Sequence, residues 1–307
     1  MQPVVTLPDA EWAEALAPLV DDYECAVWEV DASPALEAGR VRVVVLPYMA
    51  PPQALASLAD LPSLALVQTL TTGYDGLPER VPADVVLASA AGIHDASTAE
   101  LAVGLVLATL RGIDDAVRDA EQGRWRHRTR HSLADRRVLL IGVGGVGTAV
   151  ADRLAPFEVS VTRVASAARV DHRGPVHGAD ELAALLPEAE VVVLATPLTA
   201  STHGLVDAAF LAAMPDGALL VNVGRGAVVD TSALLAELRR GRLRAALDVV
   251  DPEPLPEGHP LWGAPGLLLM PHVGGDTSAM RPRALALLTD QLTRLATGAE
   301  LRNVVPR

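Results

Sequence analysis

Three ionisable side chains in the last third of the chain are candidates for catalysis: Arg225, Glu253 and His272. A guanidinium can bind a carboxylate and a carbonyl oxygen together, because its N–H groups form a planar fork. An imidazole can donate a proton to an oxygen that gains negative charge, and a neighbouring carboxylate can orient and charge that imidazole. Side chains of these types suit the transfer of hydride to the carbonyl of a 2-keto acid.

The three side chains lie in short loops, each of which follows an apolar run typical of a buried β-strand. A fourth loop, which contains Thr196 and Pro197, has the same setting. Ligands of open α/β sheets bind outside the carboxyl ends of the strands, so we expect these loops to line one crevice. The loop segments are Ala195–Thr199, Val221–Gly226, Ala246–Pro254 and Met270–Gly275.

A glycine motif earlier in the chain indicates a dinucleotide site. Gly142, Gly144 and Gly147 have the G-x-G-x-x-G spacing, directly after the apolar run Arg137–Ile141 and before a helical stretch that begins near Ala149. The first glycine permits a tight turn, the second lets backbone approach a pyrophosphate, and the third allows close packing of helix and strand. The amides expected to meet the phosphates at the helix N-terminus are those of Gly145 and Val146.

The strand after this motif bears on the choice of cofactor. A site for NAD has an acidic residue ~20 positions beyond the motif, which binds the ribose hydroxyls. This chain has Arg163 there, followed by Ser166 and Arg169, and its next acid is Asp171. We therefore predict NADP(H), with NAD(H) as the second possibility, and Arg163 and Ser166 as ligands of the 2'-phosphate, with Arg169 as a further candidate. The alternative is that Arg163 only faces solvent.

Composition excludes several other classes of protein. The chain has 307 residues, 38 acidic side chains against 25 basic ones, and a formal charge of -13, so nucleic acid and anionic membranes are not expected partners. All basic residues except histidine are arginine, which excludes chemistry that needs a lysine amine. The single cysteine, Cys25, excludes a disulfide framework, and no spacing suggests a metal site. We expect a cytoplasmic protein.

The order of the predicted elements indicates an α/β fold. Short apolar runs alternate with amphipathic stretches in two series, which begin at Val4–Leu7 and at Arg137–Ile141. This alternation is typical of doubly wound parallel sheets, and the chain length favours two domains. A long helix is predicted from about Ser97 to Glu121, and a last helix from about Ser278 to Thr297.

From about Leu46 onward the sequence closely resembles the D-2-hydroxyacid dehydrogenase family. The resemblance rests on the glycine motif, the four loop segments, and the segments Thr72–Asp75, Thr98–Glu100 and Gly123–Trp125. It implies a flavodoxin-like substrate domain formed by residues 1–91 and 280–307, and a Rossmann cofactor domain inserted as residues 92–279. It also implies a homodimer.

The resemblance assigns roles by position. Arg225 would bind substrate, His272 would bind it and act as the acid/base, and Glu253 would be the partner of His272. The amides of Thr72 and Gly73 would hold the substrate carboxylate. Asp248 would contact the nicotinamide amide, and the other residues expected to contact the cofactor are Thr98, Thr196, Pro197, Thr202, Val223, Gly224 and Gly274.

These expectations favour an NADPH-linked, D-stereospecific reductase of small 2-keto acids such as glyoxylate or hydroxypyruvate. Arg163 favours the phosphorylated cofactor, and a chain that stops at Arg307 has no room for the C-terminal regulatory domain of some family members. Two alternatives stay open. One is a cofactor-sensing regulator without enzymatic activity, and the other is a dehydrogenase of a different small anion, such as formate or phosphite.

Overall fold

The computed structural model describes residues 1–28, 38–48 and 52–306, and the chain divides into two compact units. The first, which we call the terminal unit, comprises Met1–His94 and Thr277–Arg307. The second, the central unit, comprises Asp95–Asp276. The boundaries therefore lie three residues from those expected at 91/92 and 279/280.

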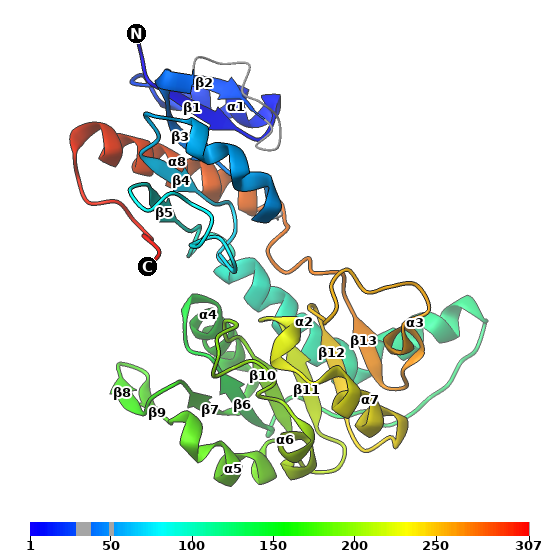
Figure 1. Cartoon of the computed structure of the whole chain (residues 1–307). Coiled ribbons are helices and arrows are strands. Elements are labelled where there is room, and N and C mark those ends of the chain that lie inside the picture. Colours follow the sequence, from blue (N-terminus) through cyan, green and yellow to red (C-terminus); the bar gives the residue numbers. More distant parts are fainter. Residues whose placement is uncertain (29–37, 49–51, 307) are drawn as a thin grey trace. The chain divides into compact units, whose positions relative to one another are not determined.

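In the described residues of the terminal unit, five parallel strands form one sheet in the order β2-β1-β3-β4-β5. Helices α1 and α8 pack on one face through Trp12, Leu16 and Leu288, and the 3-10 helix η3 packs on the other through Leu55 and Leu58 (Figure 1). The elements are β1 (Val4–Leu7), α1 (Ala10–Leu16), β2 (Glu24–Val27), β3 (Val41–Val45), η3 (Pro52–Asp60), β4 (Leu66–Gln68), β5 (Val86–Ala88) and α8 (Met280–Thr297).

The central unit is built on a sheet of six parallel strands in the order β13-β12-β11-β10-β6-β7. The strands are β6 (Arg137–Ile141), β7 (Ser160–Val164), β10 (Val191–Leu194), β11 (Leu219–Asn222), β12 (Arg244–Leu247) and β13 (Leu267–Leu269). The helices are α2 (Asp95–Arg111), α3 (Ile113–Glu121), α4 (Gly145–Leu154), α5 (Leu182–Leu185), α6 (Ala208–Ala213) and α7 (Thr231–Arg239). A hairpin of β8 (Arg169–Asp171) and β9 (Gly174–Val176) follows β7.

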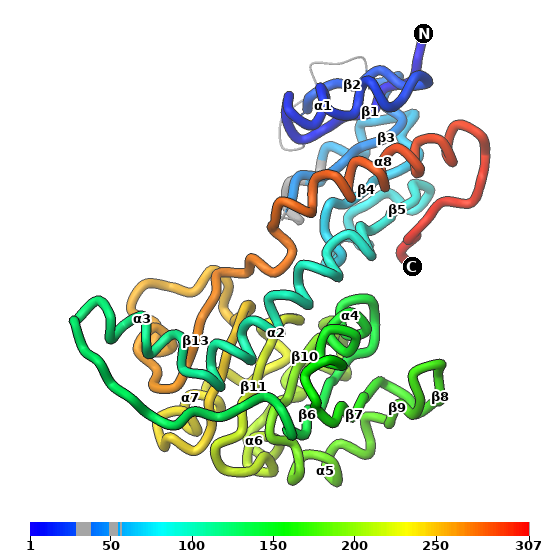
Figure 2. The backbone as a smooth tube through the Cα atoms, turned by 180° about the vertical axis from the view of Figure 1, so that it is seen from behind, coloured from blue at the N-terminus to red at the C-terminus, as the bar shows by residue number. Residues whose placement is uncertain are grey.

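Helices cover both faces of this sheet, which explains why its strands read as continuous apolar runs. Helices α2 and α4 pack on one face, and α5, α6 and α7 on the other (Figure 1 and Figure 2). Beside β7, the chain after β9 adds a single parallel bridge between Val164 and His177. With that bridge as a residual third strand, the order matches the doubly wound dinucleotide-binding sheet. The predicted fold class is confirmed.

The long helix predicted from Ser97 to Glu121 is two helices. Helix α2 ends at Arg111, and α3 begins at Ile113 after a bend of 64°. Gly112 lies between them with φ of 61°, a left-handed conformation that glycine adopts without the steric cost of a side chain. No single described helix is long and apolar enough to cross a membrane, and only the bent pair of α2 and α3 reaches that length and composition.

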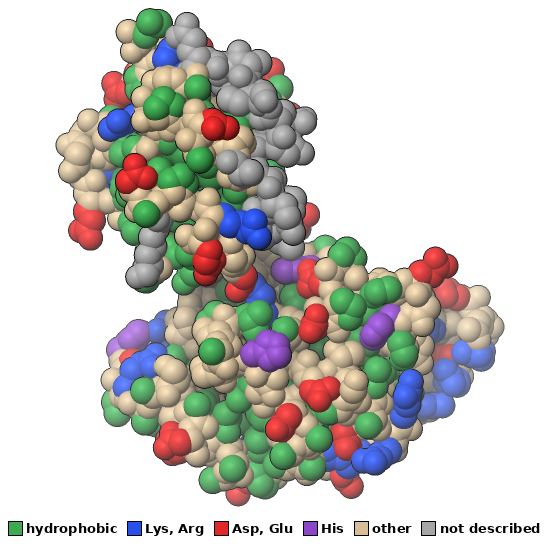
Figure 3. All heavy atoms as spheres, in the orientation of Figure 1, with side chains coloured by type: hydrophobic (Ala, Val, Ile, Leu, Met, Phe, Trp, Pro, Cys, Tyr) green, Lys and Arg blue, Asp and Glu red, His purple; other side chains and the backbone are tan. Residues whose placement is uncertain are grey.

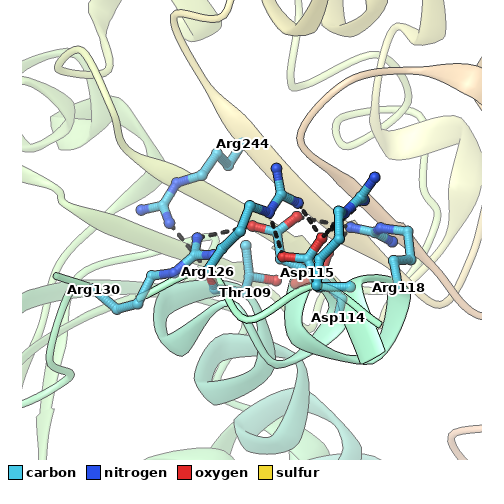
Figure 4. A network of polar contacts seen from close by, with 9 residues as sticks. Thr109, Asp114, Asp115, Arg118, Arg126, Arg130 and Arg244 are labelled. Atoms are coloured by element: carbon cyan, nitrogen blue, oxygen red, sulfur yellow. Dashed lines mark hydrogen bonds and ion pairs between the residues drawn. The ribbon is translucent and has the colours of Figure 1, made fainter. Parts of the chain in front are cut away.

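The arginine-rich segment after α3 is tied back to that helix by ion pairs. Arg124 and Arg126 both donate to Asp119, and Arg130 pairs with Asp115. Figure 4 shows Arg126, Arg130 and Arg118 converging on the acidic side chains of α3. On the face in Figure 3, basic side chains gather on the part of the central unit around α3, whereas acidic ones are scattered. The segment is thus ordered by local charge pairing.

Candidate active site

The glycine motif forms the predicted tight turn between β6 and α4. Gly142 has φ of 101°, and its amide donates to the carbonyl of Val164 at the end of β7, 2.9 Å away. A Cβ at residue 142 would overlap the backbone of Ala195, and a Cβ at residue 147 would overlap the carbonyl of Gly142. Only glycine fits both positions, because the turn, the helix and the loop after β10 approach at backbone distance.

The N-terminus of α4 suits a phosphate. Its N-cap is Gly144, which has no side chain to cap the first turn. The first amides of an α-helix have no partner within the helix, and the helix dipole favours an anion there. Gly144 and Gly145 are exposed, and Val146 is half-buried. The residues present therefore fit the pyrophosphate of a dinucleotide, in the way predicted for Gly145 and Val146.

Arg163 does not have the predicted geometry. Its side chain is 9% exposed, and its two terminal nitrogens donate to the two carboxylate oxygens of Asp171, each at 2.8 Å. One of these nitrogens also donates to the carbonyls of Gly174 and Pro175. The pair holds the pKa of Asp171 at about 2. The role of Arg163 as a 2'-phosphate ligand stays a prediction, and its hydrogen-bonding groups are directed into the β8–β9 hairpin.

The other predicted phosphate ligands lie on the surface next to this pair. Ser166 is exposed in the loop of residues 165–168, directly after β7, and Arg169 is exposed at the start of β8. The carboxyl end of this strand is where the ribose of a dinucleotide lies in the Rossmann arrangement. Ser166 and Arg169 can therefore meet a 2'-phosphate, and their role stays a prediction.

Arg225 sits in a turn after β11 that Asn222 shapes. The Asn222 side chain is fully buried, donates to the carbonyl of Arg225 at 2.9 Å, and accepts from the amide of Gly224 at 3.0 Å. One terminal nitrogen of Arg225 donates to the carbonyl of Gly224 at 2.8 Å. The side chain is half-buried. The turn thus presents the guanidinium at the carboxyl end of the strand, as predicted.

Glu253 and His272 are in direct contact. A carboxylate oxygen of Glu253 meets Nδ1 of His272, and the side chains are 31% and 24% exposed, respectively. The two residues come from the loops after β12 and before the last helix, nineteen positions apart in sequence. The contact fixes the proton on Nδ1 and directs Nε2 away from the carboxylate. The structure therefore brings this predicted pair together.

Asp248 holds the backbone that carries His272. Its side chain is 2% exposed, and its two oxygens accept from the amides of Val273 and Gly274, both at 2.9 Å. The carbonyl of Asp248 accepts from the amide of His272, whose φ of 55° is unusual for a residue with a side chain. These bonds over-determine a strained backbone at the imidazole. The predicted contact of Asp248 with the nicotinamide amide stays a prediction.

The remaining predicted cofactor residues line the same strand ends. Thr196 and Val223 are buried, and a Cβ at Gly274 would lie 3.2 Å from the Thr98 methyl group. Thr202 closes the loop after β10, since its hydroxyl donates to the carbonyl of Pro197 at 2.7 Å and accepts from the amide of Thr199. Gly224 packs against Thr196. Pro197 is exposed.

Thr72 and Gly73 lie in the terminal unit, in the loop after β4. Both are half-buried, and Thr71 donates to the carbonyl of Gly73 at 2.7 Å. Nearby, the ring of the buried His94 contacts the carbonyl of Leu70 at 2.7 Å, which fixes the start of the loop. The expected binding of a substrate carboxylate by their amides stays a prediction.

Two residues that shape the site had no assigned role from sequence. Asn222 forms the Arg225 turn, and its signal was a polar residue at the end of the apolar run Leu219–Asn222. Asp95, at the start of α2, lies against Gly145, where a Cβ would overlap its carboxylate. No sequence pattern connects Asp95 with Gly145. Among the residues that the structure describes, no group of His, Cys, Asp or Glu side chains could hold a metal ion.

Comparison with known proteins shows the family to which the chain is similar. Residues 103–274 match the model of the D-isomer specific 2-hydroxyacid dehydrogenase, NAD binding domain. Glyoxylate/hydroxypyruvate reductase B of Pectobacterium atrosepticum is 30% identical over an alignment of 308 positions, gaps included, and the match covers 92% of each chain. A D-isomer specific 2-hydroxyacid dehydrogenase of Xanthobacter autotrophicus, solved with NADPH and MES, is 30% identical with a TM-score of 0.86, over 99% of this chain and 98% of that one.

An NADPH-dependent glyoxylate/hydroxypyruvate reductase of Sinorhizobium meliloti, solved with NADP and malonate, is similar over the same extent. It is 28% identical with a TM-score of 0.83, and the match covers 99% of this chain and 97% of the other. The family model and these relatives together cover both units. The chain therefore belongs to the D-isomer specific 2-hydroxyacid dehydrogenase family.

Proposed function

We propose that this NAD(P)-dependent dehydrogenase is a reductase of small 2-keto acids of the glyoxylate and hydroxypyruvate type, uses NADP(H), and forms the D-hydroxy acid. The contact between Glu253 and His272 carries this proposal, because it supplies an oriented proton donor. The turn of Arg225 and the loop of Glu253 approach at backbone distance, since a Cβ at Gly226 would overlap the carbonyl of Val250. The names of the relatives from Pectobacterium and Sinorhizobium support the substrate class.

In this reaction the nicotinamide, when bound, supplies the hydride. The Glu253 carboxylate accepts a hydrogen bond from Nδ1–H of His272 and favours the imidazolium, which is also protonated at Nε2. The Nε2 proton goes to the substrate oxygen, and the imidazole is left neutral with its Nδ1–H still bonded to Glu253. Arg225 offers a planar fork to the carboxylate and carbonyl of the keto acid. Asp248 keeps the His272 backbone in place through its bonds to the next two amides.

The cofactor preference rests on the end of β7. The acid that follows Arg163 in the sequence, Asp171, is bonded to Arg163. Ser166 and Arg169 are exposed beside it and can bind a 2'-phosphate. Two related structures were solved with NADPH or NADP bound. We therefore assign the preference for NADP(H) to Ser166 and Arg169 in place of Arg163.

Turnover assays with NADPH and NADH against glyoxylate, hydroxypyruvate and pyruvate test the proposal. We expect reduction of glyoxylate or hydroxypyruvate, with NADPH preferred by about 10-fold or more in kcat/KM, since a charge-assisted contact contributes about 1.5–3 kcal/mol. Arg169→Gln should reduce that preference. Binding of NADPH without turnover of any keto acid would favour a regulator, and oxidation of formate or phosphite alone would favour the other alternative.

We also propose that the protein is a homodimer, as the resemblance implies. Ile113 and Val117 lie one helical turn apart on α3 and are 53% and 55% exposed, and Trp125 is 97% exposed in the segment that follows. The ion pairs of Asp119 hold this segment in place, so its apolar side chains are presented to a second copy. Light scattering should give twice the chain mass, and Val117→Asp with Trp125→Ser should give the monomer mass.

A further inference from the structure

We propose that Arg163 and Asp171 form a positioning pair for the cofactor, which holds the loop of residues 165–168 in the shape that binds the adenosine end of the dinucleotide. The inference rests on the family assignment and on the geometry around β7. It gives Arg163 a role through Asp171, in place of direct contact with a phosphate. The pair therefore acts on cofactor affinity, whatever the keto acid.

The Arg163 guanidinium binds the β8–β9 hairpin through several hydrogen bonds. It donates four hydrogen bonds, two to Asp171 and one each to the carbonyls of Gly174 and Pro175. Asp171 also accepts from the amide of Arg173 at 2.8 Å. A bidentate pair in a nearly buried setting is among the strongest side-chain contacts. The pair therefore joins the β8–β9 hairpin to the carboxyl end of β7, the edge strand of the sheet.

The chain that follows the hairpin also contacts the loop of residues 165–168. The carbonyl of His177, just after β9, accepts from the amide of Ala165 at 3.0 Å, and the amide of His177 donates to the carbonyl of Arg163 at 2.8 Å. At the other end of the loop, a Cβ at Gly178 would lie 3.4 Å from the amide nitrogen of Ala168. The chain that follows the hairpin is therefore bonded to one end of the loop and lies close to the other.

The loop of residues 165–168 begins next to a strand end that is bonded to the glycine turn. The carbonyl of Val164 accepts from the amide of Gly142, so the last residue of β7 is bonded to the turn that precedes the phosphate-binding helix. The ribose in a Rossmann site lies between these two features. A shift of the hairpin would move the loop relative to the pyrophosphate site. The Arg163–Asp171 pair thus fixes a distance on which binding of the whole adenosine moiety depends.

Two accounts of Arg163 make opposite predictions for Asp171→Asn. If Arg163 bound the 2'-phosphate directly, loss of the Asp171 charge would release the guanidinium and strengthen NADPH binding. If the pair positions the loop, the same substitution weakens the bidentate contact and lowers affinity. Positioning affects NADPH and NADH alike, because both cofactors share the adenosine.

Fluorescence titration with NADPH and with NADH measures cofactor binding without any keto acid, so its result is independent of the substrate proposed above. We expect Arg163→Gln and Asp171→Asn each to raise the Kd of both cofactors by about 10-fold or more, as misplacement of a binding element does. The double variant R163Q/D171N, which restores a neutral hydrogen-bonding pair, should recover part of the affinity.

Arg173→Gln is the matched control. Arg173 is on the same hairpin and forms a similar two-point ion pair with Asp152 of α4, but the side chains are 32% and 52% exposed. Exposed pairs contribute little, so its Kd values should stay within about 2-fold of wild type. If a single variant does not fold, the cofactor Kd values of R163Q/D171N test the positioning role. This variant leaves neither the Arg163 charge nor the Asp171 charge unpaired.

Three results would overturn the positioning role. In one, Arg163→Gln raises the Kd of NADPH but not that of NADH, and Asp171→Asn binds NADPH as well as or better than wild type. This result would indicate that Arg163 binds the phosphate directly. Another is lower thermal stability of folded single variants with unchanged Kd values, which indicates a purely structural pair. The third is a folded double variant that binds both cofactors as wild type while neither single variant folds.

Discussion

The helix that follows the first strand of each unit begins in a different way, although both units are doubly wound parallel sheets. In the terminal unit, Asp9 caps α1, and its carboxylate accepts from the amide of Trp12 at 3.0 Å. In the central unit, α4 begins at Gly145 with Gly144 as its N-cap and no capping side chain. The N-cap residue of α1 therefore bonds its own helix, whereas the N-cap of α4 has no side chain and leaves backbone that suits an anionic ligand.

The same difference extends to the catalytic groups. All the side chains assigned to proton transfer or substrate binding are in the central unit, whereas Thr72 and Gly73 of the terminal unit are assigned roles through backbone amides. Topology alone does not distinguish the two sheets, since both have covered faces and a reversal in strand order. The loops at the strand ends decide what each unit binds. Substitutions that compare the units therefore test this division of roles.

The largest effect is expected from Arg225→Ala. Loss of the guanidinium fork should lower kcat/KM by about 1,000-fold or more, because a charge-assisted pair to the keto acid is removed from a desolvated site. Arg225→Lys should recover little, since an ammonium cannot form the planar fork. Thr72→Ala, which keeps the backbone amide, should stay within about 2-fold of wild type. Steady-state kinetics measures these effects, and NADPH titration is the control that the variants still bind cofactor. Near-normal turnover by Arg225→Ala would contradict the role of Arg225 in binding the keto acid.

The next effect concerns the two helix starts. Gly142→Ala should destabilise the protein by about 3 kcal/mol and abolish cofactor binding, because a Cβ overlaps the Ala195 backbone at a residue with positive φ. Asp9→Ala removes a cap in the terminal unit and should cost about 1 kcal/mol with cofactor affinity unchanged. Denaturant unfolding and NADPH titration measure both. Equal loss of cofactor binding in the two variants would argue against the division of roles.

A smaller effect is expected at the proton donor. Glu253→Gln removes the charge beside His272 and lets an amide N–H face Nδ1, which favours the wrong tautomer. We expect kcat to fall by about 100-fold with little change in the Kd of NADPH. Glu257→Gln, four residues along in the same exposed loop, is the control and should retain full activity. If both variants are equally active, Glu253 does not orient the imidazole.

Local turn chemistry made much of the site predictable from sequence. The turn at Gly142 and the strand-end positions of Arg225, Glu253 and His272 follow from short segments whose residue types have few structural solutions. The break at Gly112 was missed, because apolar residues on both sides continue the helical pattern and a single glycine is tolerated within helices.

The surroundings of Arg163 were not predictable in this way. Counting from the glycine motif located the end of β7 correctly, but the direction of the side chain depends on Asp171, which the β8–β9 hairpin brings close. Each strand of that hairpin has three residues, too few for a periodic pattern. A residue's position along a strand was therefore predictable, whereas its partner across a tertiary contact was not. Asn222 was overlooked although its partners, Gly224 and Arg225, lie only two and three residues further along the chain.

The smallest effect compares two acids that each lie between two arginines, one in each unit. Asp119 of the central unit bonds Arg126 and Arg124 with its side chain 9% exposed, and these contacts hold its pKa at about 2. Asp290 of the terminal unit bonds Arg294 and Arg302 with its side chain 38% exposed, and Arg294 foremost lowers its pKa. The ion pair shielded from water is less screened, so Asp119 should contribute more to stability.

A carboxylate with a depressed pKa stabilises the fold above its unfolded value and loses that contribution as the pH falls through the folded value. The contribution of Asp119 should therefore be complete above pH 3.8 and lost toward pH 2. Asp119→Asn should lower the Tm at pH 7 more than Asp290→Asn does, and its difference from wild type should shrink as the pH falls through this range. Thermal unfolding at pH 7, 4 and 2.5 measures both differences. A difference for Asp119→Asn that does not change with pH would show that its loss of stability comes from packing and not from charge.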